Sequence, residues 1–165
     1  MTGSTDNVIY VVRHAKAGSR HAWACDDRPR PLTPAGVAQA MALADVLAPL
    51  VGDGRLLSSP FTRCVQTLQP LAGLLAATRS ITIETDERLG ESMPFEPVLS
   101  LLLSLPTGSV LCSHGDVIPD LIAALDRRGV DIVGTPRWEK CSTWVLQRSG
   151  SVQSVVRAWS WPPPS

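Results

Sequence analysis

The sequence lacks the features that mark several classes of protein. Its 15 Lys and Arg residues balance 15 Asp and Glu residues, so no excess charge would hold the chain on nucleic acid. No apolar run reaches about 18 residues, the length that a transmembrane helix needs. The segment 1–7 is polar and has no basic stretch before an apolar run, so we expect no secretory signal peptide. These absences favour a cytoplasmic protein that binds neither nucleic acid nor membranes.

The sequence also lacks a cysteine framework. Its four cysteines are far apart, and none belongs to a Cys-x-x-Cys pair. We therefore expect the reduced thiols of a cytosolic protein, since a domain of this size needs no disulfides. Zinc ligands are equally sparse, because His21 and Cys25 are the only close pair. Neither a metal nor a cofactor is expected.

Length and hydrophobicity indicate one folded domain. The chain has 165 residues, of which 44% are hydrophobic, enough to bury a core. We expect a single domain over 1–165 with its core at about 8–158, preceded by a short polar N-terminus. The three consecutive prolines near the C-terminus indicate a tail that continues neither strand nor helix.

Strand-like and helix-like patterns alternate along the chain. The continuous β-branched run Val8 to Val12 is typical of a strand covered on both faces. Further strands are predicted over 55–58, 81–84 and 109–113, helices over 33–51, 60–75, 96–105 and 115–125, and a terminal hairpin over 142–147 and 151–157. We expect the first helix to bury Val37, Ala40, Met41, Ala44 and Leu47. This order predicts an α/β fold, a three-layer αβα sandwich with a mostly parallel central sheet and helices on both faces.

Polar residues follow three of the predicted strands. The first strand leads into Arg13 and His14, the second into Ser58-Ser59 with Arg63 soon after, and the fourth into His114. The carboxyl ends of parallel strands meet at one edge of a sheet, so these side chains should gather there. Two Arg and two His residues at one spot repel each other unless an anion binds between them. Phosphate fits best, because arginine matches its oxygens in a bidentate way.

The motifs around these residues have a known order. They are Val11-Val12-Arg13-His14-Ala15, Leu32-Thr33-Pro34-Ala35-Gly36 with Gln39-Ala40, Ser58-Ser59-Pro60 with Arg63 and Gln66-Thr67, and Ser113-His114-Gly115. Together they resemble the signature of the histidine phosphatase (phosphoglycerate mutase-like) superfamily from about residue 8 to about residue 147. The resemblance implies the αβα fold of that family and a phosphohydrolase activity without metal.

The resemblance also implies roles for single residues. His14 would be the nucleophile that forms a phosphohistidine, and His114 would be the second catalytic histidine. Arg13, Arg63 and His114 would hold the phosphoryl oxygens. The backbone at Gly115 would approach the phosphate closely.

A proton donor for the leaving group is taken from a Leu-x-Glu segment in branch 1 of the family. Here the segment Arg88-Leu89-Gly90-Glu91 resembles it, so Glu91 is the expected general acid. Glu87 is the alternative. Alternatively, Glu91 and Glu87 are both ordinary carboxylates on the protein surface and have no role in catalysis.

The segment 13–30 departs from the commonest family pattern. Ala15 replaces the usual glycine, and basic residues follow, among them Lys16, Arg20 and Arg28, which we take as a candidate substrate loop. The alternative is a solvated loop whose arginines pair with Asp26 and Asp27. This segment resembles SixA-type phosphohistidine phosphatases and, more closely, the histidine phosphatase domains fused to Nudix (MutT-type) domains. The stretches Val110 to Leu125 and Lys140 to Trp144 also resemble that subgroup. The chain has no Nudix motif, so we expect the phosphatase unit alone.

Four functions compete for this sequence. The leading one is hydrolysis of a small phosphorylated metabolite, a nucleotide or pyrophosphate through a phosphohistidine. The main alternative is a SixA-type phosphatase that acts on a phosphohistidine protein. A mutase is disfavoured because the chain has no room for an inserted lid. A non-catalytic phosphate- or protein-binding module is disfavoured because Arg13, His14, Arg63 and His114 are all present.

Overall fold

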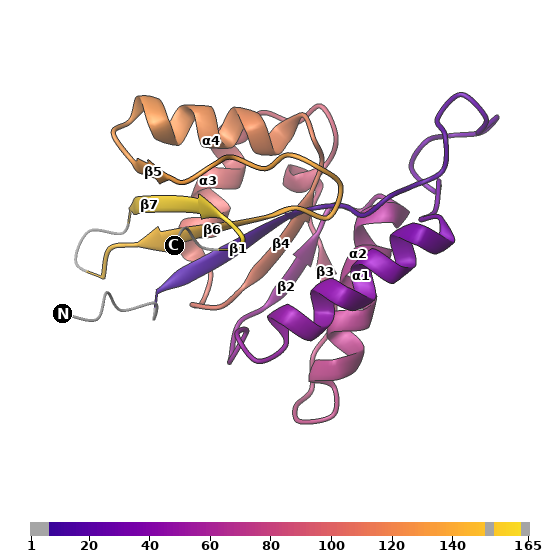
Figure 1. The fold of residues 1–165 in the computed structure, drawn as a ribbon, viewed down its shortest axis with the longest axis horizontal. Coiled ribbons are helices and arrows are strands. Elements are labelled where there is room, and N and C mark those ends of the chain that lie inside the picture. The colour runs from indigo at the N-terminus through magenta and orange to yellow at the C-terminus, as the bar shows by residue number, and fades with distance from the viewer. Residues whose placement is uncertain (1–6, 151–153, 163–165) are drawn as a thin grey trace.

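A central sheet organises the molecule. The computed structural model describes residues 7–150 and 154–162, and its ribbon is shown in Figure 1. The sheet has seven strands in the order β3-β2-β4-β1-β6-β7-β5. The strands are β1 (Val8–Arg13), β2 (Leu56–Ser58), β3 (Ile83–Thr85), β4 (Val110–Ser113), β5 (Asp131–Val133), β6 (Thr143–Arg148) and β7 (Val155–Ser160).

The sheet has a parallel half and a mixed half. Strands β3, β2, β4 and β1 run parallel, with Leu56 and Tyr10 both paired to Val110. Strand β6 is antiparallel to both β1 and β7, while the edge strand β5 is parallel to β7. The predicted strands and hairpin are therefore present in a mixed sheet, and β5 is an additional strand. Residues 151–153 of the predicted hairpin lie outside the described residues.

Two pairs of helices cover the two faces. Helices α1 (Pro34–Leu47) and α2 (Thr62–Leu75) lie on one face, and α3 (Phe95–Ser104) and α4 (Val117–Arg127) lie on the other (Figure 1). Strand β1 contributes side chains to the cores on both faces of the sheet, because successive side chains of a strand point to opposite faces. Ile9 belongs to the core under α3 and α4, and Tyr10 to the core under α1 and α2. The predicted αβα sandwich is confirmed.

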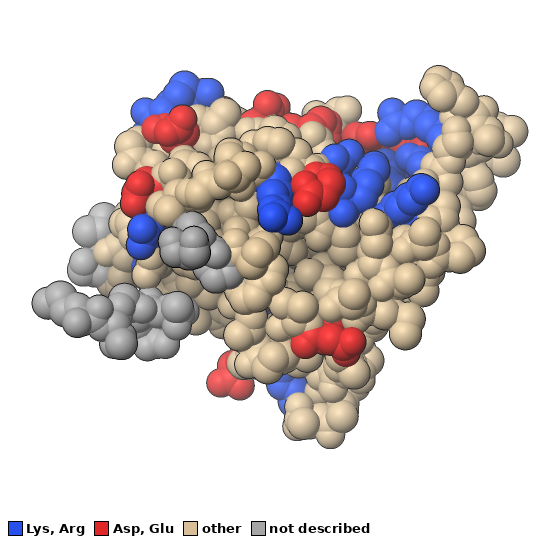
Figure 2. Space-filling model, viewed as in Figure 1, with Lys and Arg blue, Asp and Glu red and all other residues tan. Residues whose placement is uncertain are grey.

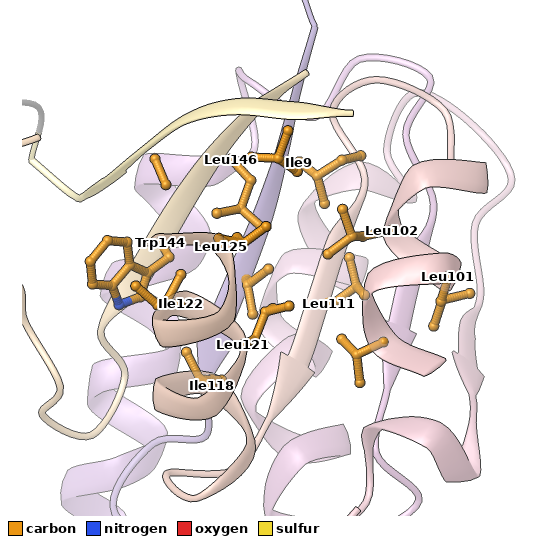
Figure 3. Packing of buried hydrophobic residues seen from close by; sticks show 14 of the residues in the cluster. Ile9, Leu101, Leu102, Leu111, Ile118, Leu121, Ile122, Leu125, Trp144 and Leu146 are labelled. Atoms are coloured by element: carbon orange, nitrogen blue, oxygen red, sulfur yellow. The ribbon is translucent and has the colours of Figure 1, made fainter. Parts of the chain in front are cut away.

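The core under α3 and α4 is built from aliphatic side chains and one tryptophan. Figure 3 shows Trp144 of β6 beside α4, with Ile9 and Leu111 on the sheet behind them. The indole of Trp144 is almost fully buried. This packing fixes β6 against α4 and therefore also fixes the segment that enters β6 at the sheet edge.

Some details of the prediction were wrong. Val37 and Met41 are 44% and 58% exposed, because α1 turns its small residues, among them Gly36 and Ala40, inward. A Cβ atom at Gly36 would lie 2.0 Å from the carbonyl oxygen of Lys16, so only glycine allows this approach. The last strand, β7, continues through Ser160, so Trp159 and Ser160 are strand residues and not part of the expected C-terminal tail. The predicted strand over 81–84 forms at Ile83–Thr85.

The remaining expectations concern membranes and thiols. Among the described residues, no helix combines the length and the apolar character needed to cross a bilayer. The four cysteines are free thiols, with Cys64 and Cys112 buried, Cys141 half-buried and Cys25 exposed.

Candidate active site

Three strand ends meet at one edge of the sheet. The amide of His14 donates to the carbonyl oxygen of Ser113 at 3.0 Å, and that of Ser59 donates to Cys112 at 2.9 Å. These bonds continue the pairing of β1, β4 and β2 by one step past the strands. As a result the rings of His14 and His114 lie edge to face, with 5.4 Å between their centroids. Both side chains are buried.

His14 is held as a neutral ring with one free nitrogen. Its Nδ1 lies 2.8 Å from the carbonyl oxygen of Ala15, which can only accept, so Nδ1 carries the proton. The lone pair is then on Nε2, to which Nε of Arg63 donates at 3.3 Å. Burial is the main cause that lowers the pKa of His14 to about 3; the bond to Ala15 opposes it, and the charges of Lys140, His114 and Arg63 reinforce it. Nε2 is therefore an available nucleophile at neutral pH.

Arg63 connects the groups of the site. It lies in the first turn of α2 and is fully buried. One terminal nitrogen lies 3.4 Å from Nδ1 of His114, 3.3 Å from Oε2 of Glu91 and 3.0 Å from Oδ2 of Asp27. Its guanidinium also stacks over the ring of Phe61, 4.9 Å from the centroid. One side chain thus reaches both histidines and two carboxylates.

His114 is held by residues of the segment 59–64, which leads from β2 into α2. Its Nε2 lies 2.8 Å from the hydroxyl of Ser59 and 3.6 Å from the thiol of Cys64. The ring of Phe61 packs edge to face against it, 4.8 Å between centroids. Because Arg63 can only donate, Nδ1 of His114 is the acceptor and Nε2–H donates to Ser59. The Nδ1 edge therefore faces the site.

Arg13 lies against the Gly115 backbone. A Cβ atom at Gly115 would lie 2.6 Å from the guanidinium carbon of Arg13, so a side chain there would displace the arginine. One terminal nitrogen donates to the carbonyl oxygen of Trp138 at 2.5 Å. The buried Nε of Arg13 has no hydrogen-bond partner among the described residues. It is an unused donor at the site.

Other motif residues hold the backbone rather than the site. Thr67 accepts from the amide of Ala15 at 2.9 Å, and Gln66 accepts from the amide of Leu32 at 2.8 Å. Gln39 of α1 accepts from the amide of Lys16 at 2.9 Å. These bonds fix the start and the end of the segment 15–32, which leaves the sheet directly after His14.

The candidate substrate loop lies over the site with its charges paired. Arg20 contacts Glu91, and Arg28 contacts Glu87 at 3.0 Å. Asp27 pairs with the buried Arg30 at 2.8 Å. Lys16 is exposed. Figure 2 shows Lys and Arg side chains gathered where β1 leads into this loop. Both sequence alternatives therefore describe part of it: the loop borders the site, and its arginines pair with carboxylates.

The two candidate proton donors lie in different places. Glu87 is the first residue of the short 3-10 helix η1 (Glu87–Leu89), and Glu91 follows the glycine after that helix. Glu91 is half-buried and contacts Arg63 and Arg20 inside the site. The side chain of Glu87 is 72% exposed. Among the ion pairs of the described residues, its only partner is Arg28, which is itself exposed.

Two residues of the site are not among the site residues that the sequence predicts. Asp27 contacts Arg63, and the hydrogen bond from Arg30 and the charge of Arg63 lower its carboxyl pKa although burial alone would raise it. Lys140 is half-buried, and burial lowers its pKa to about 8, helped by the charges of Arg13 and Arg63. In the sequence, Asp27 is one of several charged residues of the loop 13–30. Lys140 lies far along the chain from Arg13 and Arg63, whose charges act on it in the folded protein.

The site holds cations rather than metal ligands. Among residues 7–150 and 154–162, no group of three or more His, Cys, Asp or Glu side chains is placed to hold a metal ion. Arg13, Arg20, Arg30, Arg63 and Lys140 interact electrostatically around the two histidines. This arrangement suits an anion of high charge density.

Comparison with known proteins finds a matching family and a related sequence. The family model of the histidine phosphatase superfamily (branch 1) matches residues 9–94. The 8-oxo-(d)GTP phosphatase of Mycolicibacterium smegmatis is 36% identical over 143 residues, which are 86% of this chain and 44% of that protein. The chain thus spans less than half of the length of this relative.

Solved structures share the fold. The protein histidine phosphatase SixA, solved with tungstate, superposes with a TM-score of 0.71 at 22% identity, covering 90% of this chain and 92% of SixA. A protein assigned as the phosphohistidine phosphatase SixA of Agrobacterium tumefaciens superposes with a TM-score of 0.61 at 27% identity. That match covers 87% of this chain and 92% of the other.

Proposed function

Since this chain belongs to the histidine phosphatase superfamily, branch 1, we propose that it is a phosphohydrolase that works through a phosphohistidine on His14. The observation that carries the proposal is the reach of Arg63. It lies 3.3 Å from Nε2 of His14, 3.4 Å from His114 and 3.3 Å from Glu91. A nucleophile, a cation and a proton donor thus surround one position.

In the first step Nε2 of His14 attacks the phosphorus atom of the substrate. The N–P bond forms while the bond from phosphorus to the leaving oxygen breaks, and Glu91 donates a proton to that oxygen. Phosphoryl oxygens take over donors of Arg63 that now contact Asp27 and Glu91. Arg13 offers its unused Nε, while His114 and the Gly115 backbone close the other side.

In the second step water attacks the phosphohistidine. Glu91 accepts the proton of the water, the N–P bond breaks, and inorganic phosphate leaves with His14 neutral again. Burial keeps the pKa of His14 at about 3, so the released ring is not protonated at neutral pH. The scheme needs no metal, because Arg13 and Arg63 provide the positive charge at the phosphorus.

We propose small phosphorylated molecules as substrates, with nucleotides and pyrophosphate first. The cations Arg20 and Arg28, and the exposed Lys16, lie in the loop that borders the site, where they favour multiply charged anions. A curated relative is named 8-oxo-(d)GTP phosphatase, which supports a nucleotide. We also propose that the protein acts in the cytoplasm, in keeping with its free cysteine thiols.

A SixA-type activity on a phosphohistidine protein is the second candidate. It is favoured by the fold likeness to SixA, which covers 90% of this chain. The two functions share their chemistry and differ in the partner. A panel with p-nitrophenyl phosphate, nucleoside di- and triphosphates, pyrophosphate, sugar phosphates and a phosphohistidine protein separates them by kcat/KM.

The decisive experiment traps the intermediate. Wild type quenched during turnover should carry a phosphoryl adduct that is stable in base and labile in acid. The variant His14→Ala should form no adduct and show no turnover, while its Tm stays near that of wild type. Full turnover by His14→Ala would end the phosphohistidine proposal, and absence of turnover by wild type on every substrate would favour a binding module.

A further inference from the structure

The segment 138–142 passes directly over the end of β1. The amide of Arg13 donates to the carbonyl oxygen of Ser142 at 3.0 Å, and the amide of Cys141 donates to that of His14 at 3.2 Å. Arg13 also binds the carbonyl oxygen of Trp138 with its side chain. Three hydrogen bonds therefore fix this segment against the two residues at the centre of the site.

A strained residue sets the direction of this segment. Cys141 has a φ of 68°, in the left-handed region that residues other than glycine rarely adopt. Such a conformation persists only where the surroundings enforce it, and it occurs often at functional sites. Here the hydrogen bond from Cys141 to His14 holds it. The residue just before it is Lys140.

Lys140 is a cation among cations. It is half-buried, and none of the ion pairs formed by the described residues includes it. The charges that act on its ammonium group are those of Arg13, Arg63, Arg30 and Arg20. The carboxylates of the site, Asp27 and Glu91, are bound by arginines.

The backbone beside Lys140 lies against the nucleophile, because the amide of Cys141 donates to the carbonyl oxygen of His14 at 3.2 Å. The charge of Lys140 acts on the His14 ring together with those of His114 and Arg63. An unpaired cation in this position destabilises the protein unless an anion binds there. The anion that belongs beside His14 is the phosphoryl group.

We propose that Lys140 is a further catalytic residue, whose ammonium group contacts a non-bridging oxygen of the phosphoryl group as it moves to His14. The proposal rests on the phosphohistidine mechanism. During the transfer, negative charge spreads over the three equatorial oxygens of the phosphoryl group. Arg13, Arg63 and Lys140 then provide one cation for each of these three oxygens. Lys140 thus binds the phosphoryl group in the transition state and does not bind the leaving group.

The first test compares three variants with p-nitrophenyl phosphate as substrate. Lys140→Met should lower kcat/KM about ten- to a hundredfold, the effect of losing one charge-assisted hydrogen bond. Lys140→Arg should recover most of the loss. The control is Arg137→Met, which removes an exposed cation just before the segment, where it pairs with Glu139 at 3.9 Å; it should keep the wild-type rate.

The second test separates catalysis from structure. Because Lys140 faces only cations, Lys140→Met should have a Tm equal to or above that of wild type without ligand. Orthovanadate, which imitates the five-coordinate transition state, should raise the Tm of wild type more than that of Lys140→Met. A lower Tm in Lys140→Met, or an equal shift by vanadate in both proteins, would overturn the proposal.

The third test uses pH. The groups that face Lys140 are Arg13 at the end of β1, His14 directly after it, Arg20 and Arg30 from the loop, and Arg63 from α2, and the arginines stay charged. Since the pKa of Lys140 is about 8, kcat/KM of wild type should fall above that pH as the ammonium loses its proton. Lys140→Arg should keep its rate to higher pH, and an identical fall in that variant would contradict the assignment.

The outcomes also distinguish a failure of the Lys140 assignment from a failure of the phosphohistidine mechanism on which it rests. If His14→Ala keeps full turnover, the phosphohistidine mechanism fails. If His14→Ala is inactive while Lys140→Met matches Arg137→Met, only the assignment of Lys140 fails. A loss by Lys140→Met on pyrophosphate but not on p-nitrophenyl phosphate would also overturn it, because Lys140 would then contact the leaving phosphate.

Discussion

Replacing Arg63 by alanine should cost far more activity than stability. The change removes the donor at 3.3 Å from His14 and the cation at 3.4 Å from His114. Loss of one preorganised donor to a transition state lowers kcat by about 10²- to 10³-fold. We expect a loss of at least about a hundredfold in kcat/KM with p-nitrophenyl phosphate.

The effect on stability is smaller because the partners of Arg63 keep other contacts. A fully buried ion pair broken on one side costs about 3–5 kcal/mol. The side chains of Asp27 and Glu91 are 27% and 26% exposed, and Arg30 and Arg20 still bind them. The loss should therefore be close to one charge-assisted hydrogen bond, about 1.5–3 kcal/mol. That corresponds to a fall in Tm of roughly 3–12 °C.

The assay pairs steady-state kinetics with thermal unfolding. Arg148→Ala is the matched control, because Arg148 donates to the carbonyl oxygens of Leu102 and Leu105 and is absent from the site. It should lower Tm and leave kcat/KM unchanged. Arg63→Lys keeps the charge but not the fork, so it should fall between alanine and wild type. A loss of only a few-fold in Arg63→Ala would refute the reasoning.

The other predictions concern the proton donor, metals and the first helix. Glu91→Gln should slow hydrolysis of alkyl phosphates strongly and formation of the phosphoenzyme from p-nitrophenyl phosphate much less; Glu87→Gln is the control, and leaving-group dependence in that variant instead would reverse the assignment. Activity should survive EDTA, since arginines provide the charge; strict dependence on added magnesium or zinc would contradict this. Gly36→Ala places a Cβ atom 2.0 Å from the Lys16 carbonyl oxygen and should lower the free energy of unfolding by about 1–3 kcal/mol in urea titrations; an unchanged midpoint would refute the close packing.

The convergence of strand ends could be predicted from the sequence because it follows from topology. Parallel strands end at one edge of a sheet, so the residues after β1, β2 and β4 had to meet there once the alternation of strands and helices was recognised. The helix faces were harder. The same periodic pattern in α1 allows Val37 or Gly36 to face inward, and the decision depends on the backbone of Lys16, a contact that no local pattern reveals.

The missing parts of the prediction depend on long-range contacts. Strand β5 has three residues, exposed or half-buried, and is a strand only because β7 pairs with it. Asp27 and Lys140 enter the site on segments for which the sequence predicts no role of these two residues, and their roles follow only from their interactions with Arg63. Sequence reasoning ranked Glu91 above Glu87, and the turn of η1 places one inside the site and the other outside.

Because β6 runs antiparallel to β1, the site is built from two kinds of segment: the ends of the parallel strands and the segment that precedes β6. The backbone at the ends of the parallel strands is fixed by the same hydrogen bonds that hold the sheet together, so the positions of His14 and His114 follow from the sheet itself. Strand β6 runs the other way, and it therefore brings its entrance, the segment 138–142, to the same edge. The backbone of that segment is held by hydrogen bonds to Arg13 and His14, but it belongs to no parallel strand end. The charge that Lys140 contributes can therefore be changed by a single substitution while the parallel strands keep the nucleophile in its place.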